Sequence, residues 1–436
     1  MKNLSKVLLL AICLFLAQNF IYAMQGSFGT ETFTDSNGKQ QTYSKICLQP
    51  EFSIWKIDIG LDLQFYLDEN GNGREEDWNS WDDVINKFLY VRYGQKGEPL
   101  YINFGGISSA TIGHGIIFNR YSNMIRYPEF KKAGLIVDIN TPTWGIESIT
   151  TNLIRSEVFG GRFHFRPFYS TGIFLIDKLA VGLSAGTDVD PDNISTSSND
   201  AVSVVAADIE LPLLDTHILS STLFADIAQM QLGDVYVSTH SYNYYNSVSN
   251  SSTTVSGRSE NNGTGFMTGV LGKLLFLDYK VVYKSLDNNF VDGYFDTFYE
   301  VDRTNHKADK ISNTGSPKKE GYYGELGYTL KKKFSIMASY EDLTNDVNNI
   351  YPWVHAQLNV DKSLLANKFF CNFSYDKRNA QNWEQIKDMN GANSLLRAEL
   401  GYAISPSAML VIVKQRTFDS NGKEVTKTKL ETRIIF

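Results

Sequence analysis

Acidic and amide side chains lie in the segment 68–79 at the spacing that a calcium loop uses. Asp68, Asn70 and Asn72 alternate and Gly73 follows them, which matches the pattern D-x-[DN]-x-[DN]-G. Hard oxygen ligands at alternate positions suit Ca²⁺. The twelfth position is Asn79, where that loop has a bidentate Glu, and Asn and Gly also favour a plain polar turn, so two interpretations stay open. The expected ligands are Asp68, Asn70, Asn72 and Glu75.

A second candidate is the segment 111–132, which contains Gly113, His114 and Gly115 and several cationic side chains. Histidine can act as a general base, so catalysis is one interpretation. However, no nucleophilic serine pairs with His114 by its spacing, and glycines on both sides more often mark a tight backbone path. A charged constriction is the other interpretation. Its candidates are His114, Arg120, Arg126, Lys131 and Lys132.

The segment 111–132 has two structural interpretations. Folded inward, its cations would face acidic groups across a lumen and favour small anionic or zwitterionic solutes, as charged rings do in pores. Folded outward, it is a periplasmic or surface turn with solvated charges. Which path the segment takes depends on the strands that surround it.

An N-terminal export signal precedes these elements. Lys2 and Lys6 lie before an unbroken apolar run at 7–17, which is typical of a secretory signal peptide. A spanning helix needs about 20 apolar residues, and this run is much shorter, so we expect residues 1–23 to be removed. Loss of both lysines changes the formal net charge of −7 to −9 for residues 24–436. Such a chain is not expected to bind nucleic acid.

Strands dominate the mature chain, because apolar and polar side chains alternate along many segments. The run 57–67 places six apolar residues on one face and Asp58 and Asp62 on the other. The run 159–166 alternates three phenylalanines with cationic or titratable side chains. A period of two is that of β-strands, and the pattern predicts roughly 16 to 18 of them.

Short turns and long polar stretches separate these strands. Tight turns are expected at Trp55 and Lys56, at 331–333 and at 405–407. Long loops are expected at 69–86, 238–265 and 287–319. This asymmetry is typical of outer-membrane barrels, although a soluble β-sandwich can also alternate along its strands.

The last strand carries the most specific signal. It reads back in steps of two through Phe436, Ile434, Thr432, Leu430 and Thr428. This strand resembles the terminal signal of Gram-negative outer-membrane β-barrels, whose last strand commonly ends in an aromatic residue that the assembly machinery recognises. The resemblance implies one transmembrane, antiparallel, up-and-down all-β barrel over 24–436 in the bacterial outer membrane. Outer-membrane lipid and the assembly machinery are then its partners, and Phe436 is its assembly signal.

A sheet in lipid must close, because every backbone polar group needs a partner there. The apolar faces then point outward and the charged faces point into a wide, wet lumen. A barrel of about 16 to 18 strands is wide enough for an aqueous channel. The expected pore-lining residues are Asp58, Asp62, Arg92, Arg162, His164, Arg166, Arg397, Glu399 and Arg433.

A porin-like channel for passive diffusion of small polar solutes is the simplest function of such a barrel. The alternative is a plugged surface or structural barrel whose long loops bind a partner or a polysaccharide. An outer-membrane enzyme is a more distant third, so no catalytic residue and no cofactor besides Ca²⁺ is expected. A homo-oligomer is compatible with the pattern.

Isothermal titration of the refolded protein with calcium tests the loop that begins at Asp68. The calcium interpretation predicts binding heat and anomalous density at this loop, because carboxylate and amide oxygens would replace the hydration shell of the ion. Absence of binding at millimolar Ca²⁺ contradicts it.

Overall fold

The computed structural model describes most of the chain between Ile21 and Ile435. The described residues are 21–34, 40–74, 77–127, 131–191, 201–232, 236–238, 252–254, 262–287, 289–301, 303, 318–331, 333–346, 350–389, 393–405, 408–418 and 424–435. Most of the expected signal peptide, Glu75 and Phe436 lie outside them, so these three predictions stay untested. No described helix is long and apolar enough to cross a membrane.

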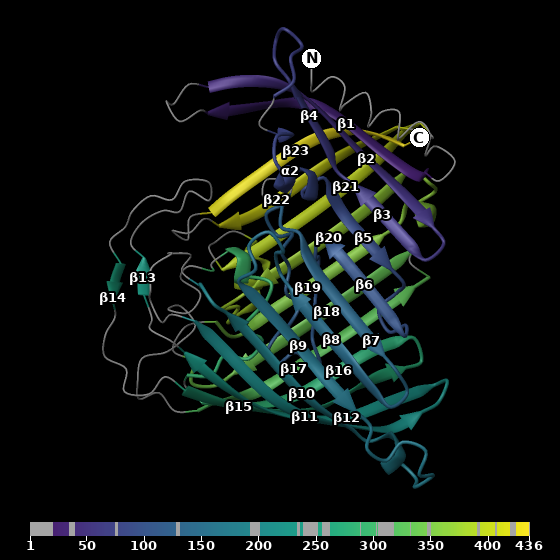
Figure 1. Ribbon diagram of the computed structural model, residues 1–436, viewed down its shortest axis with the longest axis vertical. Helices are drawn as coiled ribbons and strands as arrows, with labels where there is room; N and C mark the ends of the chain where they lie inside the picture. The colour runs from purple at the N-terminus through teal and green to yellow at the C-terminus, as the bar shows by residue number, and fades with distance from the viewer. Residues whose placement is uncertain are drawn as a thin grey trace.

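The strands form one closed antiparallel barrel (Figure 1). Within the described residues its sheet has 21 strands. They are β1 (Ile21–Thr34), β2 (Gln40–Ile54), β3 (Ile57–Leu61), β4 (Leu63–Leu67), β5 (Phe88–Tyr93), β6 (Leu100–Gly105), β7 (Gly134–Asn140), β8 (Trp144–Thr150), β9 (Val158–Phe165), β10 (Ala180–Asp188), β11 (Val202–Asp215), β12 (Leu219–Leu232), β15 (Asn262–Leu274), β16 (Leu277–Leu286), β17 (Lys319–Leu330), β18 (Phe334–Leu343), β19 (Trp353–Val360), β20 (Phe369–Lys377), β21 (Ser394–Ser405), β22 (Ala408–Phe418) and β23 (Glu424–Ile435). Among the described residues, the connections include a small hairpin, β13 (Tyr236–Ser238) with β14 (Ser252–Thr254), and the short helical turns α2 (Trp81–Ile85), η2 (Ile176–Lys178), η3 (Lys362–Leu364) and α4 (Trp383–Lys387).

Pairing between the first and last strands closes the sheet. Apart from β3 and β4, which both pair with β2, each barrel strand pairs with its neighbour along the chain. Gln25 and Gly26 of β1 pair with Ile435 and Ile434 of β23. A closed sheet has no free edge, which is the condition that lipid imposes on a spanning sheet. The prediction of an antiparallel up-and-down barrel is confirmed.

The predicted number of about 16 to 18 strands is wrong. Strands β3 and β4 lie end to end beside β2, so they count once and 20 described strands surround the lumen. Strands β5 and β6 have six residues each. Such a strand shows only three alternations, so periodicity does not separate it cleanly from its turns.

The two ends of the barrel differ in the length of their connections. One end has tight turns at 55–56, 141–143, 216–218 and 275–276, and Trp55 and Leu275 take the positive φ that such turns require. The opposite end has the long connections, and the hairpin of β13 and β14 belongs to one of them (Figure 1). The turn predicted at Trp55 and Lys56 is confirmed, and the asymmetry is that of outer-membrane barrels.

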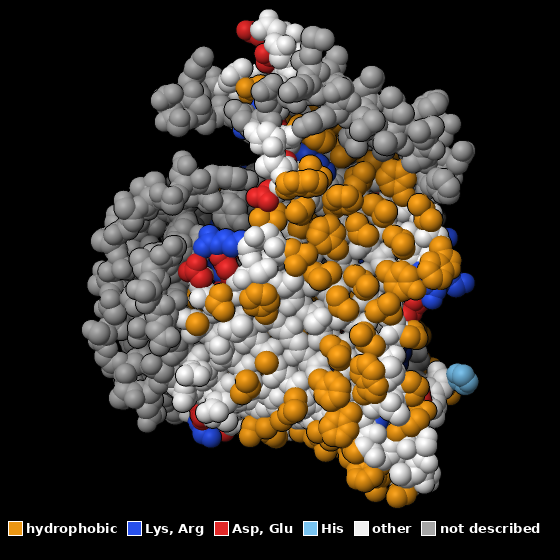
Figure 2. Space-filling view, in the orientation of Figure 1, with side chains coloured by type: hydrophobic (Ala, Val, Ile, Leu, Met, Phe, Trp, Pro, Cys, Tyr) orange, Lys and Arg blue, Asp and Glu red, His pale blue; other side chains and the backbone are white. Residues whose placement is uncertain are grey.

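Side chains alternate between the lumen and the outside as their strands predict. On β9, Phe159, Phe163 and Phe165 are exposed, whereas Arg162 and His164 are buried. Hydrophobic side chains also spread over the outer wall in Figure 2. A closed sheet that exposes phenylalanine and buries arginine is suited to a hydrocarbon surrounding.

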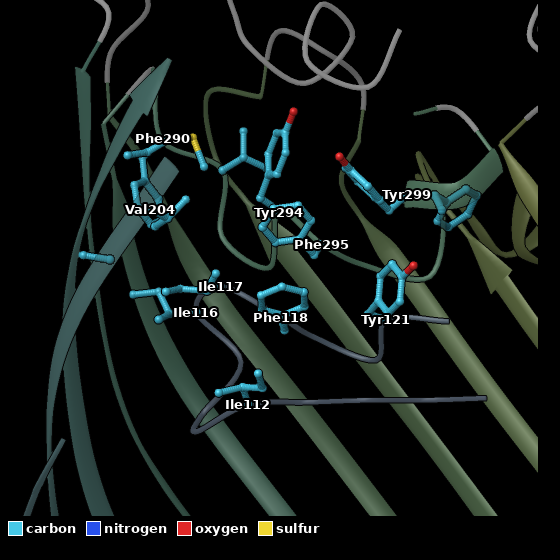
Figure 3. Packing of buried hydrophobic residues seen from close by; sticks show 14 of the residues in the cluster. Ile112, Ile116, Ile117, Phe118, Tyr121, Val204, Phe290, Tyr294, Phe295 and Tyr299 are labelled. Atoms are coloured by element: carbon cyan, nitrogen blue, oxygen red, sulfur yellow. The ribbon is translucent and has the colours of Figure 1, made fainter. Parts of the chain in front are cut away.

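Two connections fold into the barrel and fill its centre (Figure 3). We call residues 106–133 the first inner segment and residues 287–303 the second inner segment, with 128–130, 288 and 302 not described. The rings of Phe118 and Phe295 stack with centroids 4.4 Å apart. The backbone N–H of Phe295 donates to the carbonyl of Ile117 at 3.1 Å. The expectation of a wide, wet lumen is therefore wrong at the centre, where the larger buried apolar cluster of the described residues lies.

Glycines on the inner wall make room for this cluster. A Cβ on Gly160 of β9 would overlap the ring of Phe118, and a Cβ on Gly186 of β10 would lie 2.6 Å from Ile117 Cγ2. The first inner segment therefore packs directly on the backbone of the wall. By contrast, a Cβ on Gly324 of β17 would meet nothing within 4 Å.

These two kinds of glycine provide a matched test. Gly160→Ala should cost about 1–3 kcal/mol, because overpacking forces the Phe118 ring to move. Gly324→Ala should be close to neutral, since its methyl group finds open space. Urea unfolding in vesicles measures both, and limited proteolysis reports release of the first inner segment. Equal effects of the two substitutions would contradict this packing.

Candidate functional site

Ion pairs hold both inner segments to the wall and to each other. Lys132 of the first segment pairs with Glu300 of the second. Lys131 pairs with Asp62, which is fully buried beside β4 and also accepts from the hydroxyl of Tyr127 at 3.1 Å. Lys131 and Lys132 are thus engaged in ion pairs, and the charged constriction that the sequence suggested stays a prediction.

The second inner segment has its own set of ion pairs. Lys284 on β16 pairs with Asp292 and, at 2.6 Å, with Glu341 on β18. Arg303 lies 2.8 Å from Asp188 on β10. A buried charge is costly unless it is paired, so these contacts make the inner segment and the charged wall depend on one another.

His114 lies between carboxylates on two neighbouring strands. Its Nδ1 is 2.9 Å from Asp226 Oδ2 on β12, and its Nε2 is 3.3 Å from Glu210 Oε1 on β11. Its ring stacks on Phe224 with centroids 4.1 Å apart. Since carboxylates only accept, both ring nitrogens must carry protons to satisfy them. Neither nitrogen is free to act as a base, so His114 acts as a cationic anchor.

Gly113 and Arg162 extend this anchor. Gly113 has φ +54, and a Cβ there would approach Arg162 Cδ to 2.9 Å, so glycine allows the guanidinium to lie against the segment. Arg162 donates to Asp208 from Nε at 2.9 Å and also pairs with Glu210. The predicted pore residue Arg162 is thus buried against the first inner segment, and His164 on the same face of β9 is also buried.

A cavity of about 520 Å³ remains between the first inner segment and one side of the wall. Its wall side is formed mainly by β19, β20, β21 and β22. The predicted residues Arg92, Arg120, Arg397 and Glu399 line it. The sequence did not indicate the other polar residues of this cavity, among them His355, Gln357, Asn359, Asn372, Asp376, Gln415 and Arg416.

Several nitrogen atoms in this cavity lack partners. Among the described residues, Arg92 Nε, Arg120 Nε and His355 Nε2 are buried and accept or donate no hydrogen bond. His355 Nδ1 is 2.8 Å from Asp376 Oδ1, so Nδ1 carries a proton and donates it to the carboxylate. His355 Nε2 is then the ring atom left for other contacts.

A second cavity of about 290 Å³ adjoins the first toward the end with tight turns. Asn359 and Asn372 line both cavities. The second also has Lys333 and Lys362, from turns at that end, and the predicted pore residue Arg433. We call the two cavities together the side passage.

The other predicted residues lie elsewhere. Arg126 donates to the carbonyl of Val301 at 3.3 Å, so it joins the two inner segments. Arg166 donates to the carbonyl of Pro142 at 3.1 Å at the tight-turn end. Asp58 faces Arg92 across β3 and β5.

The calcium candidate is a compact turn. Asp68 Oδ1 accepts from the backbone N–H groups of Asn70 and Asn72 at 2.9 and 2.7 Å, and Gly71 has φ +79. Turn geometry alone therefore accounts for the presence of Asp68 and Gly71 in this segment. Calcium binding stays a prediction.

The sequence of β19 contains a pattern that could have indicated some residues of the side passage. His355, Gln357 and Asn359 alternate with Val354, Ala356 and Leu358. The alternation places the polar residues on the lumen face. It does not tell which part of the lumen stays open.

Comparison with known proteins found no matching family model and no matching curated protein sequence. Solved structures give weak matches. The outer membrane protein OprD from Pseudomonas aeruginosa has 9% identity over 95% of this chain and 92% of its own, with a TM-score of 0.32. OpdK from the same organism has 7% identity over 95% of this chain and 97% of its own, with a TM-score of 0.32. A BenF-like porin from Pseudomonas fluorescens Pf-5 has 7% identity over the same shares of the two chains, with a TM-score of 0.31. These values are too low to carry residue roles or solutes to this chain.

The class of protein follows from its own geometry. The sheet closes on itself, its outer wall exposes phenylalanine while arginine is buried inside, and tight turns and long loops lie at opposite ends. These are the features of an outer-membrane β-barrel. The chain is therefore a β-barrel of the outer-membrane type.

His114 lies outside the spanning strands and makes its anchor pH-dependent. Burial by itself lowers the pKa of His114, but hydrogen bonds to Asp226 and Glu210 outweigh it and raise the pKa from 6.5 to about 9. A raised pKa stabilises the folded state fully below the ordinary pKa, and this contribution is lost as pH rises through the folded-state pKa. The anchor should therefore weaken between pH 6.5 and about 9.

Hydrogen–deuterium exchange in the first inner segment measures this loss. After correction for intrinsic rates, exchange near His114 should increase as pH passes about 9. His114→Gln, which cannot titrate, should exchange faster at neutral pH and show no such step. A step of the same size in this variant would assign the pH dependence to other groups.

Proposed function

We propose that this barrel is a channel for small polar solutes, preferentially anions, that cross through the side passage and not through the centre. The central lumen is occupied by the inner segments, whereas the two adjoining cavities extend to the tight-turn end. Cationic side chains outnumber carboxylates along the first cavity, where Arg92, Arg120, Arg397 and Arg416 lie with Asp376 and Glu399.

The guanidinium groups that line the first cavity carry this proposal. Arg92 and Arg120 line the cavity from β5 and from the first inner segment, and a guanidinium group binds a carboxylate through strong charge-assisted hydrogen bonds. His355 Nε2 could accept from a solute hydroxyl, or donate to an anion when the ring is protonated. A polar anion with hydroxyl groups suits this set of partners.

The size of the cavity limits the solute. About 520 Å³ falls within the roughly 300–1,000 Å³ of small-molecule sites. Long polymers and folded domains do not fit such a space, so the proposal is restricted to solutes such as sugar acids and small carboxylates. Glucuronate, present in a structure of Pseudomonas aeruginosa OccK2, is a convenient test anion.

A plugged barrel is the second candidate, and the filled centre favours it. Stacking of Phe118 on Phe295 and the surrounding ion pairs close the middle of the lumen. In this case the long connections would bind a partner and the cavities would hold only water.

Planar-bilayer recording separates the two candidates. The channel predicts stable conductance steps and a reversal potential that indicates anion preference in a KCl gradient. Glucuronate should reduce the chloride current, because both anions use the same passage. A correctly folded barrel that gives no steps supports the plugged barrel.

Arginine substitutions locate the current. Arg92→Gln and Arg120→Gln should each lower the anion-to-cation permeability ratio by up to about fivefold, since a unit charge at about 4 Å in water is worth about 1 kcal/mol. Arg155→Gln is the matched control. Arg155 is exposed just before the first residue of β9, and it lines neither cavity. Unchanged selectivity in both cavity variants rejects the side passage.

A further inference from the structure

The connection between β9 and β10 differs from the other turns at its end of the barrel. It spans 166–179, whereas the other fully described connections at that end run from two residues, at 55–56 and 275–276, to eight, at 361–368. In Figure 1 it projects beyond the barrel at the lower right and contains η2. A tight turn would suffice to join two neighbouring antiparallel strands, so the added length needs another explanation.

Apolar side chains of this connection are exposed. Phe174 is 85% exposed and Ile173 is 51% exposed. The other exposed apolar side chains are Phe168, Tyr169 and Ile176. A soluble protein rarely leaves such a group together in water.

The exposed group continues onto the lipid-facing wall. A concave surface there is lined by Thr143, Trp144, Phe163, Phe165 and Arg166. Its rings are packed together, with Phe163 centroids 6.5 Å from Trp144 and 6.2 Å from Phe165. The connection therefore extends an established lipid-facing surface past the last residue of the strand.

Backbone hydrogen bonds within the connection suit it to an interfacial position. The N–H groups of Tyr169, Thr171 and Asp177 donate to carbonyls of Arg166, Phe168 and Ile173 at 3.3, 3.2 and 3.1 Å. The N–H groups of Lys178 and Leu179 are bonded within η2 and its flanks. Satisfied backbone groups lower the cost of leaving water.

The composition of the connection also fits a membrane surface. Aromatic residues prefer the boundary between headgroups and acyl chains. Arg166 and Lys178 flank the apolar residues at both ends, and long cationic side chains can reach back to headgroups from such a position. The apolar middle and cationic ends match a phospholipid surface.

We propose that the connection 166–179 is a membrane anchor, which lies in the headgroup and upper acyl region of the leaflet at the tight-turn end. Its partner is the phospholipid surface and not a second protein. The anchor fixes the depth and tilt of one side of the barrel, and it does not depend on solute passage.

Depth measurement with a single fluorophore tests the anchor. The labelled variant carries Phe174→Cys with Cys47→Ser and Cys371→Ser, and an environment-sensitive dye is attached in the mature barrel in phospholipid vesicles. Gln95→Cys in the same background is the matched control, because Gln95 is exposed in a polar turn at the same end. Dye at position 174 should be blue-shifted and quenched several-fold more by lipids that carry a spin label near the headgroup.

Two further measurements make the outcome decisive. Phe168→Ser with Ile173→Ser should abolish lipid quenching at position 174, while heat-modifiable gel mobility confirms that the barrel is folded. Equal access of an aqueous quencher to positions 174 and 95 overturns the proposal. Protection from the aqueous quencher without lipid quenching also overturns it, and indicates that protein covers the connection.

Discussion

The pairing of β1 with β23 is the constraint on which the rest of the structure depends. A sheet in hydrocarbon cannot leave backbone donors at an open edge, and the register of Gln25 with Ile435 removes that edge. Closure also assigns the two faces of every strand. Phenylalanines of β9 then contact lipid, while Arg162 and His164 face inward.

Closure also places many charged side chains on the inner wall, and each of them needs a partner or water. Water could satisfy them in a wide channel, but here the inner segments supply partners. Lys132 meets Glu300, Arg303 meets Asp188, and His114 meets Asp226. Each of these charges would be costly to bury alone. The plug and the charged wall therefore stabilise each other, and the space left between them is the side passage.

The side passage lies where pairing is incomplete. Along β19 to β22 the inner face offers amides and His355. Opposite them, Arg92 of β5 and Arg120 of the first inner segment have Nε atoms without a partner among the described residues. Apolar packing is concentrated around Phe118 and Phe295 instead. A barrel can thus combine a dry centre with a polar side, because side chains of its inner face vary from strand to strand.

Local patterns predicted the part of the fold that depends on single strands. The alternation of Phe163 with Arg162 was sufficient to assign their faces, whereas β5 and β6 were too short for their periodicity to give the strand number. The inward path of the first inner segment was one of two interpretations, since Arg120 and Lys131 would be compatible with water as well as with a wall.

The sequence by itself determined the class of fold, because a period of two is a property of neighbours along the chain. Only the tertiary structure decided which charges remain free. Asp226 is 112 residues from His114, and Glu300 is 168 residues from Lys132. Such partners meet only after the barrel has closed and the inner segments have folded into it. Pairing across a lumen depends on distance in space, which the spacing of residues along one strand does not contain.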